Sequence, residues 1–271
     1  MVNAKPILGK KVWEGRIKMK KSFLNHERSL LTAMLFQYND FEQTVGGIRN
    51  GLANGAEAFC LQIESLKEEY KNLENYKKMF AEMQGKPCYV TNYRSGSNSG
   101  KCDETLAEEM LEIAENGATL CDVMGDMFCR HPEELTDNPE AIERQMKYIK
   151  ALHEKGVEVL MSSHVLKFTP AERVLEIALE QKRRGADIIK IVTGAETMEE
   201  QIENLRITTL LKKELDTPFL FLSGGECSIH RRLGMKLGCC MCLCVYDNNQ
   251  DPAVVQPLLK IAKAVRDDMG F

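Results

Sequence analysis

The sequence lacks long apolar runs and a strong excess of basic charge. None of its 271 residues falls in a run near the ~18 consecutive apolar residues that a membrane-spanning helix requires. The lysine-rich segment 1–21 has no apolar core of the kind found in secretion signals. The formal net charge of −4 does not favour binding to nucleic acid or to an anionic membrane. We therefore expect a cytoplasmic protein without nucleic-acid or membrane partners.

The ten cysteines form neither a disulfide framework nor a metal-binding pattern. Several lie in apolar strand-like runs, where a thiol packs as a small hydrophobic group. Cys239 and Cys242 have CxxC spacing, but residues three apart on a strand point to opposite faces and cannot share one metal ion. Cys240, Cys242 and Cys244 share a face, at steps of roughly 6.6 Å that do not suit a zinc site. We expect packed thiols and no metal.

Linkers, internal repeats and a dinucleotide-binding fingerprint are also missing, and the chain instead shows a regular alternation. Eight apolar runs of strand length are each followed by an amphipathic helical stretch. The expected strands are Leu30–Phe36, Ala58–Glu64, Pro87–Tyr93, Thr119–Met124, Val157–His164, Asp187–Thr193, Pro218–Ser223 and Cys239–Tyr246. The expected helices are Asp40–Leu52, Leu73–Met83, Asp103–Glu115, Asn138–Lys155, Pro170–Arg184, Met198–Lys213, Ile229–Lys236 and Pro252–Asp268. Eight such units predict an α/β fold, the (β/α)8 TIM barrel, in preference to an open doubly wound sheet.

The barrel is expected to form a single domain over residues 1–271, with residues 1–28 as an N-terminal extension. Within the extension, Val12–Met19 alternates weakly and is expected to form a hairpin that closes the bottom of the barrel. Gly156 and Gly185 follow the ends of two predicted helices, as glycine commonly does.

Lys190 is the most informative residue because it lies in an apolar run that should be buried. On the period of a strand it shares a face with Ile188 and Val192. A buried ammonium is costly unless it is paired or deprotonated, and desolvation lowers the pKa of a lysine and frees its amine as a nucleophile. A paired structural lysine remains the alternative.

His164 ends the strand before the one that carries Lys190, so both side chains should reach the same mouth of the barrel. An imidazole near an imine can move protons on and off the adjacent carbon. A hydrogen-bonded histidine without a catalytic role is the alternative.

Several motifs together resemble the type I 3-dehydroquinate dehydratase family. Met161–Pro170, with its Ser-Ser-His core and Thr-Pro helix start, is similar to the family's fifth strand. Asp187–Lys190 follows at the spacing of the family's Schiff-base lysine strand. Arg94-Ser95, Ser228–Gly234 and Gln250 resemble further family segments.

The resemblance implies a cofactor-free dehydratase acting on a small-molecule carboxylate, with a homodimer left open. In the family, a lysine forms an imine with a ring ketone and a histidine removes the adjacent proton, roles that fall on Lys190 and His164. Arg231 would hold the substrate carboxylate, Gln250 would support that contact, and Arg94 would contact a ring hydroxyl.

The sequence departs from the family pattern on two predicted strands. The family carries Glu-x-Arg at the end of its second strand, where this chain has Gln62-Ile-Glu64. Where the family has a glutamate that orients the histidine, the best alignment places Met124 of this chain. Asp122 or Asp126 are candidates to take the role of that glutamate.

Glu64 bears most directly on specificity, and we place it with Gln62 on one strand face among the substrate-binding residues. A carboxylate close to Lys190 would raise the pKa of the lysine, unless Arg94 pairs with Glu64. We therefore expect slow turnover of 3-dehydroquinate and a preference for a related keto acid. A different Schiff-base lyase or aldolase, acting on a related keto acid or a phosphorylated substrate, and a non-catalytic relative are the alternatives.

Overall fold

A computed structural model describes residues 21–24, 26–246 and 255–270, and within them eight parallel strands alternate with eight α-helices. The strands are β1 Leu30–Met34, β2 Ala58–Gln62, β3 Cys88–Thr91, β4 Leu120–Met124, β5 Glu158–His164, β6 Ile188–Gly194, β7 Phe219–Gly224 and β8 Met241–Cys244. The helices are α1 Phe41–Ala53, α2 Leu73–Glu82, α3 Asp103–Glu115, α4 Pro139–Glu154, α5 Ala171–Arg183, α6 Met198–Glu214, α7 His230–Leu237 and α8 Leu259–Asp268. Short 3-10 turns occupy Ile63–Ser65, Glu68–Tyr70 and Gly96–Asn98.

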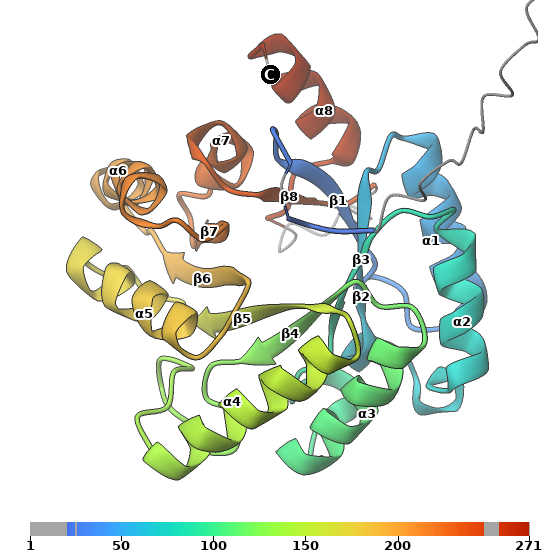
Figure 1. The fold of residues 1–271 in the computed structure, drawn as a ribbon. Helices are drawn as coiled ribbons and strands as arrows, with labels where there is room; N and C mark the ends of the chain where they lie inside the picture. Colours follow the sequence, from blue (N-terminus) through green and yellow to red (C-terminus); the bar gives the residue numbers. More distant parts are fainter. Residues whose placement is uncertain (1–20, 25, 247–254, 271) are drawn as a thin grey trace, which may run out of the picture.

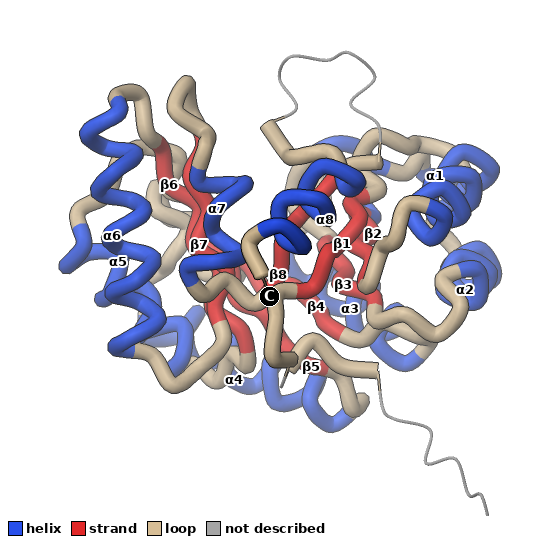
Figure 2. The backbone as a smooth tube through the Cα atoms, turned by 90° about the horizontal axis from the view of Figure 1, so that it is seen from above, coloured by secondary structure: helices blue, strands red, loops and turns tan. Residues whose placement is uncertain are grey.

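The strands form the inner wall of a barrel and the helices surround it (Figures 1 and 2). Neighbouring strands follow the order β7-β6-β5-β4-β3-β2-β1-β8. The backbone N–H of Cys240 donates to the Phe219 carbonyl at 2.9 Å and links β8 to β7, the two ends of that order. The prediction of a (β/α)8 TIM barrel is therefore confirmed.

Helix boundaries follow local capping chemistry. Asp40 and Asn138 accept hydrogen bonds from the first turns of α1 and α4, as N-cap residues do. Gly156 and Gly185, just beyond the ends of α4 and α5, have φ of 79° and 103°, which glycine adopts without steric cost. The two predicted helix ends are confirmed.

Four of the eight predicted strands, those corresponding to β1, β2, β3 and β8, were two residues too long at their carboxyl ends. Sheet pairing of β2 with β3 stops at Gln62 and Thr91, so Glu64 lies in a 3-10 turn and not on the face of a strand. Tyr93 likewise follows β3. Apolar composition continues past the last hydrogen-bonded pair, because these loops also pack against the barrel. The predicted Val12–Met19 hairpin lies outside the described residues.

Cys239 and Cys242 do not form a common site. The Cys239 thiol donates to the Phe221 carbonyl, whereas the Cys242 thiol lies 3.6 Å from that of Cys244. Burial raises the pKa of Cys239 to about 12. In the described part of the chain, no three His, Cys, Asp or Glu side chains lie together as metal ligands, and no helix is long and apolar enough to cross a membrane.

Candidate active site

A cavity of about 250 Å³ opens at the carboxyl ends of the strands. This is the end of a (β/α)8 barrel at which catalytic groups are found. Its apolar wall includes Val192, Leu222 and Leu243. Its polar lining residues are Gln62, Tyr89, Thr91, Tyr93, His164, Lys190, Arg231 and Gln256. The structure thus brings together four residues predicted from the sequence: Gln62, His164, Lys190 and Arg231.

Lys190 is 4% exposed and reaches the cavity from the middle of β6. Its Nζ lies 2.7 Å from the Tyr93 hydroxyl, 3.0 Å from the Tyr89 hydroxyl and 3.4 Å from Oδ2 of Asp122. The side chain of Gln181 on α5 bonds both the N–H and the carbonyl of Lys190, each at 3.1 Å. The amine is therefore paired and lies at the cavity wall, and its role as a nucleophile stays a prediction.

Asp122 organises the surroundings of the amine. Its Oδ2 accepts hydrogen bonds from the hydroxyls of Tyr89 and Tyr93, the latter at 2.6 Å, and its Oδ1 accepts one from Ser162 at 2.6 Å. Burial, reinforced by the charge of Asp122, raises the pKa of both tyrosines well above 10. Both tyrosines therefore stay protonated at neutral pH.

His164 is oriented by Glu134, in the segment between β4 and α4. Oε2 of Glu134 lies 2.6 Å from Nδ1 of His164 and 2.8 Å from its backbone nitrogen. A carboxylate at Nδ1 selects the tautomer with the proton on that nitrogen. Nε2, for which the described residues supply no partner, is then free to act as a base. The imidazole also meets the Tyr93 ring edge-on, with centroids 5.4 Å apart.

Glu134 takes the role for which Asp122 and Asp126 were considered. Asp122 binds the lysine and the tyrosines, and Asp126 pairs with Arg94. No sequence pattern indicated Glu134, because nine residues outside any helix or strand, 125–133, separate it from β4 and it adopts a left-handed conformation with φ of 47°.

Arg231 brings a half-buried positive charge to the cavity from the first turn of α7. Its Nε donates to the Ser223 carbonyl at 2.9 Å, and no carboxylate pairs with it among the described residues. Burial lowers the pKa of its guanidinium to about 10, so it remains charged at neutral pH. An unpaired guanidinium at a cavity wall is suited to binding an anion.

Two glutamines present unpaired acceptors near the mouth. Oε1 of Gln62 and Oε1 of Gln256 are buried and have no hydrogen-bond partner among the described residues. Both residues also line an adjoining cavity of about 630 Å³. Gln250, the glutamine predicted from the sequence, lies outside the described residues. Gln256 was missed because the apolar stretch around it resembled the start of the last helix.

Arg94 does not line the cavity, and its guanidinium forms ion pairs with two aspartates instead. Its guanidinium pairs with Asp103 at 2.6 Å and with Asp126 at 2.8 Å. Although burial opposes the charged form, the hydrogen bonds to the two aspartates raise the pKa of Arg94. The suggested pairing of Arg94 with Glu64 is therefore wrong.

Glu64 is buried and is satisfied by its own surroundings. Its carboxylate accepts from the Thr91 hydroxyl at 2.8 Å and from the Tyr93 backbone N–H at 3.3 Å. Burial raises the pKa of this carboxyl group, and the hydrogen bonds from Thr91 and Tyr93 oppose the shift. The carboxylate that contacts Lys190 is that of Asp122.

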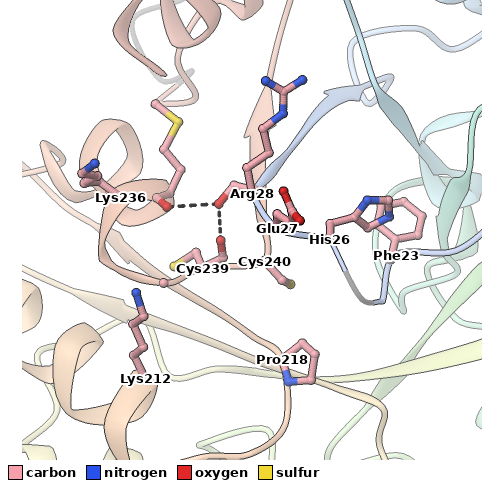
Figure 3. Close-up of a pocket in the computed structure, with 12 residues that line it drawn as sticks. Phe23, His26, Glu27, Arg28, Lys212, Pro218, Lys236, Cys239 and Cys240 are labelled. Carbon is pink, nitrogen blue, oxygen red and sulfur yellow. Dashed lines mark hydrogen bonds between the residues drawn. The ribbon is translucent and has the colours of Figure 1, made fainter. Parts of the chain in front are cut away.

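A third cavity, of about 460 Å³, is lined by the residues drawn in Figure 3. Three of its lining residues each directly precede a strand: Ser29 precedes β1, Pro218 precedes β7 and Cys240 precedes β8. The cavity therefore lies at the end of the barrel opposite to the cavity around Lys190. The basic side chains of Lys212 and Lys236 also line the third cavity. Because barrel chemistry takes place at the other end, the cavity around Lys190 is the candidate active site.

Comparison with known proteins agrees with this geometry. The family model for type I 3-dehydroquinase matches residues 35–263. The chain belongs to the type I 3-dehydroquinase family. The matched range includes Lys190, His164 and Arg231, and it runs from the residue after β1 into α8.

Three matching proteins share less than 30% sequence identity with this chain. A 3-dehydroquinate dehydratase from Clostridium kluyveri is 29% identical over 158 residues, and the alignment spans 58% of each protein. The crystal structure of the type I enzyme from Clostridium difficile aligns with 90% of this chain and 93% of its own, with a TM-score of 0.75 and 17% identity. The enzyme from Geobacillus kaustophilus aligns over 92% and 95%, with a TM-score of 0.77 and 16% identity.

Proposed function

We propose that this protein is a Schiff-base-forming dehydratase, a lyase that eliminates water from a cyclic hydroxy-keto carboxylate. The observation that carries the proposal is the meeting of Lys190, His164 and Arg231 in one cavity. These groups supply a nucleophilic amine, a base and an anion-binding guanidinium. Membership of the type I 3-dehydroquinase family supports the same chemistry.

The reaction begins at the substrate ketone. The amine of Lys190 adds to the carbonyl carbon; the oxygen takes the proton that the nitrogen loses and a second proton from solvent, and it leaves as water to give an iminium ion. Nε2 of His164 removes a proton from the adjacent carbon, and the iminium accepts the electron pair. The hydroxyl on the next carbon then leaves as water with the proton that His164 returns. Hydrolysis of the imine releases the enone product and restores the amine.

Arg231 and the two glutamines define the substrate class. The guanidinium of Arg231 binds a carboxylate, and the free Oε1 atoms of Gln62 and Gln256 accept hydrogen bonds from ring hydroxyls. A phosphate at the turn after β7 is less favoured, because Oε1 of Glu196 lies only 2.5 Å from the position that a Cβ on Gly225 would occupy. A carboxylate beside that glycine would repel a phosphate.

Borohydride trapping tests the proposal. With 3-dehydroquinate and borohydride, intact-mass measurement should show one added ligand, located by peptide mapping at Lys190. Lys190→Ala should abolish the adduct, whereas Lys167→Ala, which removes an exposed lysine after β5, should retain it. An adduct on another lysine, or one that survives Lys190→Ala, contradicts the proposal.

The identity of the keto acid is a second question. A kcat/KM for 3-dehydroquinate in the ordinary enzyme range of about 10⁴–10⁸ M⁻¹s⁻¹ would make it the substrate and contradict the expected slow turnover. A far lower value would favour a related keto acid. The cytoplasmic location and the homodimer stay predictions for fractionation and light scattering.

A further inference from the structure

The amine of Lys190 lies between two phenol hydroxyls that share one carboxylate. Tyr93 and Tyr89 are 2.7 and 3.0 Å from Nζ, and both hydrogen-bond to Oδ2 of Asp122. Each hydroxyl has a single proton, which it donates to Asp122, and therefore accepts an N–H from the lysine. Three polar groups thus form a closed network around the atom that would attack the substrate.

Imine formation must change this network. A free amine has two N–H bonds, one for each tyrosine, and a lone pair that can point to the substrate. A protonated imine keeps one N–H bond and can satisfy only one of the two tyrosines. Between these states a proton must leave the nitrogen and a proton must reach the former ketone oxygen. A hydroxyl in contact with Nζ is placed to carry out both transfers.

The two tyrosines are not equivalent in position. Tyr89 lies within β3 and is 0% exposed, whereas Tyr93 follows β3 and is half-buried at the cavity wall. Tyr93 is the closer of the two to Nζ, and its ring contacts the ring of His164. Tyr93 therefore lies nearer to the open part of the cavity, where the substrate must enter.

We propose that Tyr93 is a catalytic residue that relays a proton from Lys190 to the substrate ketone oxygen, an inference that rests on the proposed function. The Nζ lone pair forms the C–N bond, and the carbonyl π pair moves to oxygen. That oxygen takes the Tyr93 hydroxyl proton, and the Tyr93 oxygen takes a proton from Nζ. The product is a neutral carbinolamine, and Tyr93 ends as it began. Imine hydrolysis uses the same relay in reverse.

The relay divides the proton transfers between two residues. His164, which Glu134 orients at Nδ1, transfers the proton of the substrate carbon. Tyr93 transfers the protons of the lysine nitrogen and the ketone oxygen. Asp122 holds the Tyr93 hydroxyl against Nζ and retains Tyr89 and Ser162 as donors when Tyr93 turns to the substrate.

Rapid-quench borohydride trapping measures the step directly. Wild type, Tyr93→Phe and Tyr89→Phe are mixed with 3-dehydroquinate, quenched into borohydride at increasing times, and the Lys190 adduct is quantified by mass. Each variant loses one hydroxyl that contacts both Lys190 and Asp122, so the two are matched in their effect on the charge network. Tyr93→Phe should slow adduct formation about 10²-fold, the size of a lost general acid–base contact, and leave the final yield unchanged. Tyr89→Phe loses the same two contacts but no relay, so its adduct should form at least about tenfold faster than that of Tyr93→Phe.

The outcomes separate the two proposals. Adduct formation by Tyr93→Phe at the wild-type rate, or equal slowing by both variants, overturns the relay and leaves the Schiff-base function intact. A wild type that forms no adduct with 3-dehydroquinate or with other cyclic keto acids overturns the proposed function and the relay with it.

Discussion

Oε2 of Glu134 accepts hydrogen bonds from both the backbone N–H and Nδ1 of His164, at 2.8 and 2.6 Å. A single oxygen thus binds both the backbone at the end of β5 and the side chain of His164, and it orients the imidazole. The Ser163 hydroxyl donates to the Glu134 carbonyl at 2.8 Å and holds the backbone of the glutamate in turn. The histidine therefore depends for its orientation on a loop from the neighbouring βα unit.

Glu134→Gln should lower kcat by about 10- to 100-fold with little change in KM. The amide can still accept one hydrogen bond, but it no longer stabilises the imidazolium that forms when His164 takes a proton. Steady-state kinetics measure the effect, and Glu133→Gln is the matched control, since Glu133 pairs with Arg173 and does not touch His164. Borohydride trapping should remain normal in Glu134→Gln. Wild-type turnover would remove Glu134 from the mechanism.

The fold and part of the site could be predicted because both depend on local pattern. Apolar runs separated by amphipathic helices set the barrel, and a lysine within an apolar strand is visible in any reading of the sequence. Glu134 and Gln256 could not be found this way, because irregular loops place Glu134 against His164 and Gln256 at the cavity wall. The substrate contact of Arg94 stays a prediction: its place after β3 indicated that contact, and the structure adds the ion pairs with Asp103 and Asp126, which the sequence did not indicate.

Arg231→Lys should weaken binding of carboxylate substrates, raising KM about tenfold or more, because an ammonium cannot make a bidentate contact with a carboxylate. The folded structure should be retained, which circular dichroism can check. The neighbouring Arg232→Lys is the control, because Arg232 is exposed and does not line the cavity. If neutral analogues bind wild type as tightly as carboxylates do, Arg231 does not bind the substrate anion.

Arg94→Met should act on stability and not on substrate binding. Removing the guanidinium leaves the carboxylates of Asp103 and Asp126 facing each other without a cation, and breaking a buried pair in this way costs about 3 kcal/mol. Urea unfolding measures the loss. Arg49→Met, which breaks an exposed pair with Glu82, should change the unfolding midpoint little. A normal unfolding midpoint together with a raised KM would instead restore Arg94 as a substrate contact.

Glu64 should make the stability of the protein depend on pH in a direction opposite to that of most paired carboxylates. Burial raises the pKa of Glu64 above the value of 4.5 that the unfolded chain would have, so between these two values the folded state binds more protons than the unfolded state. The free energy of unfolding contributed by this group therefore falls as pH rises through that window. Glu64→Gln, which mimics the protonated form, should gain stability relative to wild type as pH rises from 4.5 towards neutrality.

Glu57 provides the contrast. Although burial opposes ionisation, hydrogen bonds from Arg266 and Leu31 lower the pKa of Glu57. Its contribution to stability is therefore present above pH 4.5 and is lost as pH falls through the lowered pKa. Glu57→Gln should thus lose stability relative to wild type at neutral pH. Urea unfolding of the three proteins at several pH values measures both differences, and the same sign of pH dependence in the two variants would show that Glu64 is not the destabilising carboxylate.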